Sequence, residues 1–306
     1  MIPFEGRKKK LGDRKDGFRI RNLDPMGLLI PYIMKTKSDS WVLFEDTIDI
    51  TKTQVFLQEQ RRDGWKGLTT YHLLFAALVR TISQIPQLNR FVQGNHIYSR
   101  NEIKFSMVVK KGMHFDGDRT IITPHFELED TLQDVYRRVD EIVETIDRTV
   151  KVEDDENKSG FDGLETALAM IPDFLLRFVV GMLKWMDRRG WLPKSFTDLS
   201  PFHTSCFITN MGSMGLSSIY HHIYEFGTTS IFIALGKKYS VNEIARDGST
   251  VKKTYISLKV VADERITDGF VYASAFKAIR NYMMHPEQLM VPPETVVPDA
   301  IDRVKK

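Results

Sequence analysis

The sequence lacks the residues that would define several common classes of protein. It has one cysteine, Cys206, which excludes an internal disulfide and a cysteine-based zinc cluster and favours a reducing compartment. No stretch of about 18 residues is free of charge, as a transmembrane helix would require. No apolar segment follows the charged N-terminus in the manner of a secretory signal peptide. These absences predict a cytoplasmic protein.

The excess of one sign of charge is also small, because 43 Lys and Arg residues are nearly balanced by 40 Asp and Glu residues among 306. A net charge of +3 gives no reason to expect nucleic acid as a partner. The uneven part is residues 1–21, in which eight Lys or Arg residues face three Asp or Glu residues. We interpret residues 1–25 as a basic N-terminal arm, either solvated or in contact with a neighbouring subunit or an acidic surface.

The common motifs for phosphate binding, nucleophilic hydrolysis and metal binding are missing as well. The glycines at 112–117 and 212–215 precede no Lys-Ser/Thr pair and lack the Rossmann spacing. There is no G-x-S-x-G nucleophile elbow. The adjacent His221 and His222 would point to opposite faces of a strand, and no carboxylate pair near them completes a site. We therefore expect no bound metal.

The hydrophobic fraction of 42% and charged fraction of 27% are those of a globular chain. Its periodicity mixes helices and short strands without internal repeats or a Gly- or Ser-rich linker, which predicts a single α+β domain over residues 26–290 and a C-terminal tail over 291–306. The predicted helices span 26–35 (interrupted at Pro31), 69–85, 131–150, 163–189 and 268–284. The predicted strands span 41–50, 91–92, 97–98, 103–110, 120–125, 205–209, 230–236 and 254–261.

The segment 163–189 is unusual, and we interpret residues 160–195 as an apolar helical insertion. Its polar side chains Asp173, Arg177, Lys184 and Arg188 share a stripe about 60° wide on a helical projection, and nearly all others are apolar. So narrow a polar stripe requires extensive burial. The helix is expected to pack on its own domain or a sister subunit, or alternatively on a membrane surface.

The most informative segment is the junction between the strand at 254–261 and the last helix. It reads Asp263-Glu264-Arg265-Ile266-Thr267-Asp268-Gly269. Asp268 is placed to cap the helix, where a carboxylate meets free N–H groups and the positive end of the helix dipole.

This D-x-R-x-x-D-G segment also resembles the signature of the dihydrolipoamide acyltransferase catalytic domain, the core component of 2-oxoacid dehydrogenase complexes. Three other landmarks follow the family order: Pro86-Gln87-Leu88-Asn89 after a long apolar helix, SCFITNMG at 205–212 and SIFIALG at 230–236. The resemblance covers about residues 26–290. It implies a chloramphenicol acetyltransferase-like, two-layer α+β fold, with a mixed sheet covered by helices, that forms trimers.

The resemblance also implies active sites between subunits of a homotrimer or a multiple of trimers. In the family, a histidine removes the proton of a coenzyme A or lipoyl thiol, and the thiolate attacks an acyl thioester. A Ser or Thr hydroxyl supports the oxyanion of the tetrahedral intermediate. Thr209 matches the hydroxyl position and Asp268 the end of the motif, so coenzyme A or acyl-CoA is the implied ligand.

The family histidine is replaced here by Glu264. Three hypotheses follow: Glu264 is the base, another histidine such as His222 or its neighbour His221 supplies it, or the site is inactive. Glu264 could also be a mere surface residue, or a salt-bridge residue that pairs with Arg265 or Lys259. A free glutamate titrates about two pH units below a free histidine, so it is the weaker base toward a thiol unless burial changes this.

The chain begins almost at the catalytic core, so we expect no lipoyl domain of its own. The sequence thus predicts a stand-alone acyltransferase-like protein that moves an acyl group between a thioester and an unknown acceptor, with Glu264, Thr209, Asp268 and His222 at the site. The alternative is a catalytically inactive trimeric scaffold or regulatory module of the same fold. Contact with a membrane surface is a third hypothesis.

Overall fold

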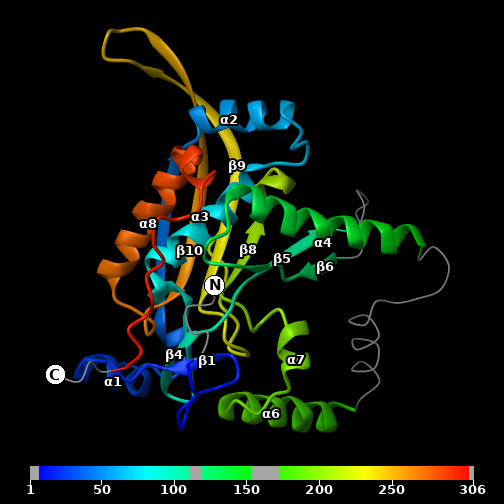
Figure 1. The fold of residues 1–306 in the computed structure, drawn as a ribbon, viewed down its shortest axis with the longest axis vertical. Helices are drawn as coiled ribbons and strands as arrows, with labels where there is room; N and C mark the ends of the chain where they lie inside the picture. Colours follow the sequence, from blue (N-terminus) through cyan, green and yellow to red (C-terminus); the bar gives the residue numbers. More distant parts are fainter. Residues whose placement is uncertain (1–6, 111–118, 153–171, 303–306) are drawn as a thin grey trace.

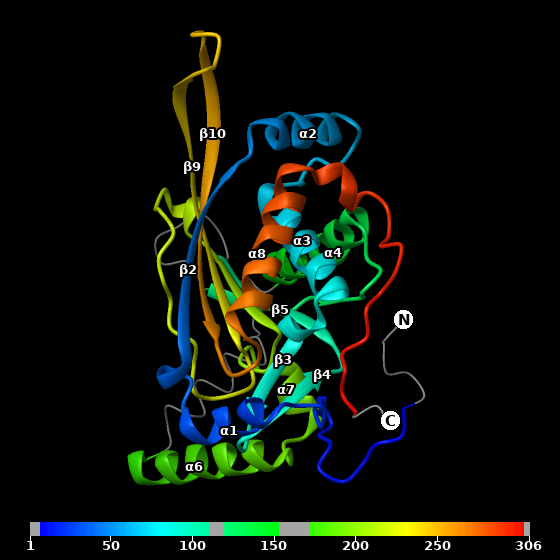
Figure 2. The ribbon, with the colours of Figure 1, turned by 90° about the vertical axis from the view of Figure 1, so that its left-hand side faces the viewer.

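The computed structural model describes residues 7–110, 119–152 and 172–302, and it has two layers (Figures 1 and 2). The helices are α1 (Pro25–Ile33), α2 (Thr51–Arg62), α3 (Thr70–Gln84), α4 (Leu132–Val152), α6 (Asp173–Arg189), α7 (Lys194–Leu199) and α8 (Gly269–Met284). The strands are β1 (Gly17–Arg19), β2 (Trp41–Asp49), β3 (Arg90–Gln93), β4 (His96–Arg100), β5 (Ile103–Lys110), β6 (Arg119–Ile122), β7 (His125–Phe126), β8 (Cys206–Asn210), β9 (Ile231–Ile244) and β10 (Thr250–Asp263).

The large sheet is mixed, with strand order β2-β10-β9-β8-β5-β6. Strand β8 is parallel to both β5 and β9, and the other pairs are antiparallel. Helices α3, α4 and α8 cover one face of this sheet (Figure 2). The predicted α+β class, with a mixed sheet covered by helices, is confirmed.

Helix α3 lies at the centre of the core, with 13 of its 15 residues buried. This explains why its sequence is apolar on nearly every side. The side chain of Thr69 accepts a hydrogen bond from the N–H of Tyr71, and His72 closes the capping box at the start of the helix. Helix α8 begins as predicted, with the carboxylate of Asp268 accepting from the N–H of Val271 at 2.9 Å.

The N-terminal segment is not a solvated arm from residue 14 to residue 20. Strand β1 joins β4 and β3 in a second, three-stranded sheet. Arg14 is 6% exposed, because it forms ion pairs with Asp16 and with Asp187 of α6. The basic residues of this segment thus serve partly to anchor the chain to its own domain.

Other parts of the fold also differ from the sequence prediction. Helix α2 was not predicted, and β9 and β10 extend into a long hairpin that projects beyond the domain (Figure 1). The predicted helix at 163–189 is confirmed from Asp173 onward, and residues 163–171 lie outside the described residues. Within the described ranges, no helix is both long and apolar enough to cross a membrane.

The face of the sheet opposite the helices is only partly covered. Residues 216–224 run across it, and Ile223 packs with Phe207, Phe232 and Val261 in a small cluster of buried side chains. Elsewhere this face carries exposed apolar residues on β2, β5 and β6, namely Trp41, Leu43, Val108 and Ile121. We call this surface the outer sheet face.

Candidate functional site

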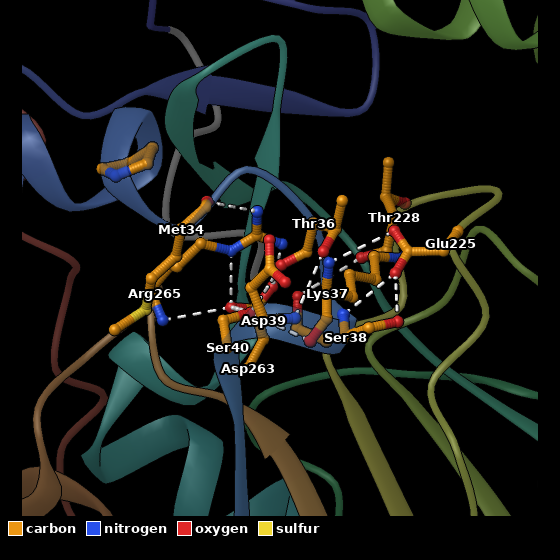
Figure 3. A network of polar contacts seen from close by, with 12 residues as sticks. Met34, Thr36, Lys37, Ser38, Asp39, Ser40, Glu225, Thr228, Asp263 and Arg265 are labelled. Atoms are coloured by element: carbon orange, nitrogen blue, oxygen red, sulfur yellow. Dashed lines mark hydrogen bonds and ion pairs between the residues drawn. The ribbon is translucent and has the colours of Figure 1, made fainter.

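The D-x-R motif forms a buried ion pair at the end of β10 (Figure 3). Asp263 is 0% exposed and binds Arg265 through two hydrogen bonds, of 2.8 Å to Nε and 2.7 Å to Nη2. The hydroxyl of Ser40 donates to the same carboxylate at 3.0 Å, and Arg265 also donates to the carbonyl of Met34. The turn between β10 and α8 is therefore fixed by buried charges.

Glu264 lies between these two buried side chains and is itself exposed. Its N–H donates to the carbonyl of Ser40 at 2.9 Å, so the backbone is held while the side chain faces solvent. Its carboxylate makes no hydrogen bond or ion pair with the described residues. The expected pairing of Glu264 with Arg265 or Lys259 is wrong. Arg265 binds Asp263 instead, and the Nζ of Lys259 lies 3.8 Å from Oε2 of Glu45.

A second buried cation, Lys37, lies beside this pair (Figure 3). Its Nζ donates to the carbonyl oxygens of Tyr224 and Gly227 at 2.9 and 3.0 Å. Its backbone N–H and that of Ser38 donate to the carboxylate of Glu225. Lys37 thus ties the segment before β2 to the segment that covers the outer sheet face.

Burial lowers the pKa of Lys37 to about 8, although Asp263 and Glu225 oppose this shift. The unfolded chain keeps this proton up to about pH 10.4. Between those two values unfolding takes up a proton, so the contribution of Lys37 to stability must rise with pH. The penalty for burying its charge is complete below about pH 8 and is relieved as the folded lysine loses its proton.

We therefore predict that the stability difference between wild type and Lys37→Met grows in favour of wild type from pH 7.5 to pH 9.5, by on the order of 1–2 kcal/mol. Urea unfolding at several pH values measures it. Lys52→Met on α2, an exposed lysine, is the matched control and should show a constant difference. A constant difference for Lys37→Met as well would contradict the burial of a charged lysine.

The second candidate element is the turn after β8. Thr209 is half-buried, and the one partner of its hydroxyl among the described residues is the sulfur of Met211 at 4.0 Å. Among the described residues, no nitrogen or oxygen atom is thus recorded as its hydrogen-bond partner. The turn requires glycine, since a Cβ on Gly212 would lie 2.7 Å from the carbonyl oxygen of Gly236.

The two adjacent histidines lie on the segment over the outer sheet face. The ring of His221 stacks on Phe232 with centroids 4.1 Å apart and on His222 at 4.6 Å. His222 is exposed, and its ring meets the edge of Tyr224. No group of three or more His, Cys, Asp or Glu side chains able to hold a metal occurs in the part of the chain that the structure describes.

One chain does not bring Thr209 and Glu264 together. Thr209 is opposite Ala234 on β9, and Ala234 is opposite Lys259 on β10, five residues before Glu264. At about 3.3 Å per residue the two side chains are separated by about 16 Å along the strands, before two strand spacings are added. His221 lies between them, because Phe232 pairs with both Phe207 and Val261.

The comparisons with known proteins agree with this architecture. Residues 199–291 match the family described as 2-oxoacid dehydrogenases acyltransferase (catalytic domain). The match covers less than a third of the chain. The matched range contains all the candidate residues of the 2-oxoacid dehydrogenase acyltransferase motif, from Thr209 to Asp268. No curated protein sequence matches the chain.

Solved structures share the acyltransferase fold over nearly the whole chain. A probable dihydrolipoamide acetyltransferase from Listeria monocytogenes has a TM-score of 0.51 at 16% identity, covering 92% of this chain and 97% of its own. The cubic core of the pyruvate dehydrogenase multienzyme complex has a TM-score of 0.50 at 13% identity, and the match covers 94% of this chain and 95% of that one. The Azotobacter vinelandii dihydrolipoamide acetyltransferase, studied for a serine, a histidine and an asparagine in its catalytic mechanism, has the same values.

Sequence reasoning found the exposed members of the motif but missed the residues that support it. Asp263 and Arg265 were visible as part of D-x-R, although their pairing was not predicted. The sequence did not indicate that Lys37 and Ser40 belong to this network, because they lie more than 180 residues from their partners.

Proposed function

We propose that this protein transfers an acyl group between a thioester, of coenzyme A or a lipoyl group, and an acceptor thiol, at a site formed between two copies of the chain. The observation that carries this proposal is the separation of Thr209 from Glu264 in one chain. The segments that carry Thr209 and Glu264 are both present, and we infer that the two side chains meet across an interface to which each neighbouring subunit supplies one of them.

In the proposed reaction, Glu264 of one subunit removes the proton from the acceptor thiol. The thiolate attacks the carbonyl carbon of the acyl thioester, and the hydroxyl of Thr209 from the adjacent subunit donates a hydrogen bond to the tetrahedral oxyanion. The intermediate collapses, the bond to the donor sulfur breaks, and the leaving thiolate takes the proton back from Glu264. The exposed carboxylate of Glu264 in a single chain fits a group that a neighbouring subunit covers.

Self-association is part of the proposal. The outer sheet face presents Trp41, Leu43, Val108 and Ile121 to solvent in one chain, and a second copy would bury them. The projecting β9–β10 hairpin likewise exposes Tyr239, Val241, Ile244 and Val251. A two-stranded hairpin is marginally stable by itself, so a neighbouring subunit is its expected support.

The second candidate function is an inactive trimeric scaffold. The observation that favours it is the carboxylate of Glu264, which stands where the family has histidine and has no polar partner among the described residues. A base without a partner to hold its geometry is poorly oriented for proton transfer.

A thiol-release assay distinguishes the two candidate functions. Acetyl-CoA and longer acyl-CoAs are tested as donors with a panel of acceptors that includes dihydrolipoamide. The acyltransferase proposal predicts release above the rate without protein for at least one pair. If a folded and assembled protein released no thiol with any acyl chain length or acceptor, the result would favour the scaffold.

A further inference from the structure

Helix α6 uses only one side to hold its own domain. On that side Asp187 is buried, binds Arg14 and Gln93, and lies 3.4 Å from His203. Burial raises the pKa of Asp187, but His203 and Arg14 outweigh burial and hold this pKa below its usual value. The helix is therefore fixed in place by a buried ion network.

The opposite side of α6 carries large apolar side chains in solvent. Phe174, Phe178 and Trp185 are 76%, 68% and 47% exposed, and Met182 is exposed beside them. These four fall within about 80° of one another in helical projection. Burial inside the domain, one of the expectations from the sequence, is therefore wrong for this stripe. A patch of this kind marks an interaction surface.

Cations line the stripe. Arg177, Lys184 and Arg188 lie along one edge within about 40°, and the guanidinium of Arg189 stacks over Trp185 at 4.1 Å. All four are exposed, whereas Asp173 is the one exposed acidic residue of α6. The surface of the helix thus carries a net charge of +3.

A second apolar helix lies beside the basic edge of α6. At the tip of the β3–β4 hairpin, Asn95 donates to the carbonyl of Pro31 in α1 at 3.0 Å and accepts from Arg188 at 2.9 Å. Figures 1 and 2 place both helices at the same end of the molecule. The large apolar side chains of α1 that are exposed are Met26, Leu28, Leu29, Tyr32 and Ile33. We call the two exposed faces together the α1–α6 platform.

A polar pocket of about 190 Å³ opens between the two helices. Lys35, Lys184 and Arg188 line it, together with Lys37 and Arg265 from the network of Figure 3. Two acidic side chains, Asp187 and Glu225, also line it, and both are engaged by partners described above. The pocket is therefore cationic and lies between two apolar faces.

We propose that the α1–α6 platform docks on the surface of an anionic phospholipid membrane, with its apolar side chains among the acyl chains and the pocket cations on lipid phosphates. Exposed aromatic residues, a basic edge and a helix that lies flat on its domain are the properties of an interfacial anchor. A two-fold contact with a second copy fits less well, because it would bring two equally basic surfaces together.

The test is co-sedimentation of the full chain with vesicles of phosphatidylcholine, with and without phosphatidylglycerol. Wild type should pellet with the anionic vesicles at low salt and progressively less as salt rises. Phe178→Glu or Trp185→Glu should weaken binding at least about ten-fold. Removing the charge at Lys184 or Arg177 with glutamine should weaken it about five-fold each.

Val55→Glu and Lys52→Gln on α2, at the opposite end of the molecule, are matched controls that should bind as wild type does (Figure 1). Absence of pelleting by wild type with anionic vesicles at low salt would overturn the proposal. Gel filtration of the same variants identifies what covers the platform in that case: dissociation by Phe178→Glu would assign it to a second copy of the chain.

Discussion

Asp263→Asn is expected to lower the free energy of unfolding by about 3–5 kcal/mol, one of the two largest effects that the structure predicts. The change leaves the guanidinium of Arg265 buried without its counter-charge, since the carboxylate accepts two of its hydrogen bonds. The Ser40 hydroxyl loses its acidic acceptor as well. Ser40→Ala removes one hydrogen bond from the same carboxylate and is expected to cost about 1–2 kcal/mol.

The matched control is the less buried pair of Asp46 and Arg280. This pair has the same bidentate form, but the side chain of Arg280 is 50% exposed, so Asp46→Asn should cost less than about 1 kcal/mol. Chemical denaturation of the three variants measures the differences. Equal losses for Asp263→Asn and Asp46→Asn would contradict a structural role of burial in the motif.

The second large effect is on activity at position 264. If Glu264 is the base, Glu264→Gln should reduce the rate of thiol release by about 10²–10⁴-fold, because glutamine cannot accept the thiol proton. Glu264→His introduces the residue that the resemblance implies at this position, and should raise the rate near pH 7 by about ten-fold over wild type. The turn is held by Asp263, Arg265 and Ser40, so neither change disturbs the backbone.

Two further variants make this result specific. Glu287→Gln, on an exposed glutamate after α8, should leave the rate unchanged. Loss of activity in His222→Ala with full activity in Glu264→Gln would transfer the role of base to the histidine pair over Phe232. Full activity in both variants would show that neither group is the base.

Much of the fold could be predicted because its segments bury one clear face. The spacing of apolar residues identified α3, α4 and α8, and the cap at Asp268 fixed the start of α8. Helix α2 was missed because only Thr53 and Leu57 are buried in it, too few for a helical pattern. The outer halves of β9 and β10 were missed because they are largely exposed and rich in polar residues, so few buried apolar positions mark them as strands.

The candidate site residues come from short motifs, whereas the distances between them depend on the fold. Local sequence identified Thr209, Glu264 and Asp268, since each belongs to a short motif. The distance between Thr209 and Glu264 depends on the register of β8, β9 and β10, which periodicity does not reveal. The supporting network joins Lys37 and Ser40 to residues about 190–220 positions away, and a single sequence gives no sign of such pairs.

The central claim is that neighbouring subunits complete the site, and mixed oligomers test it most directly. Glu264→Gln and Thr209→Val chains are expressed separately and together, and thiol release is measured on assembled protein. If each site takes Glu264 from one subunit and Thr209 from the next, random mixing of two inactive variants should restore about one quarter of the wild-type rate. Activity no greater than the sum of the two separate variants, with mixed assembly verified by tagged chains, would contradict a shared site.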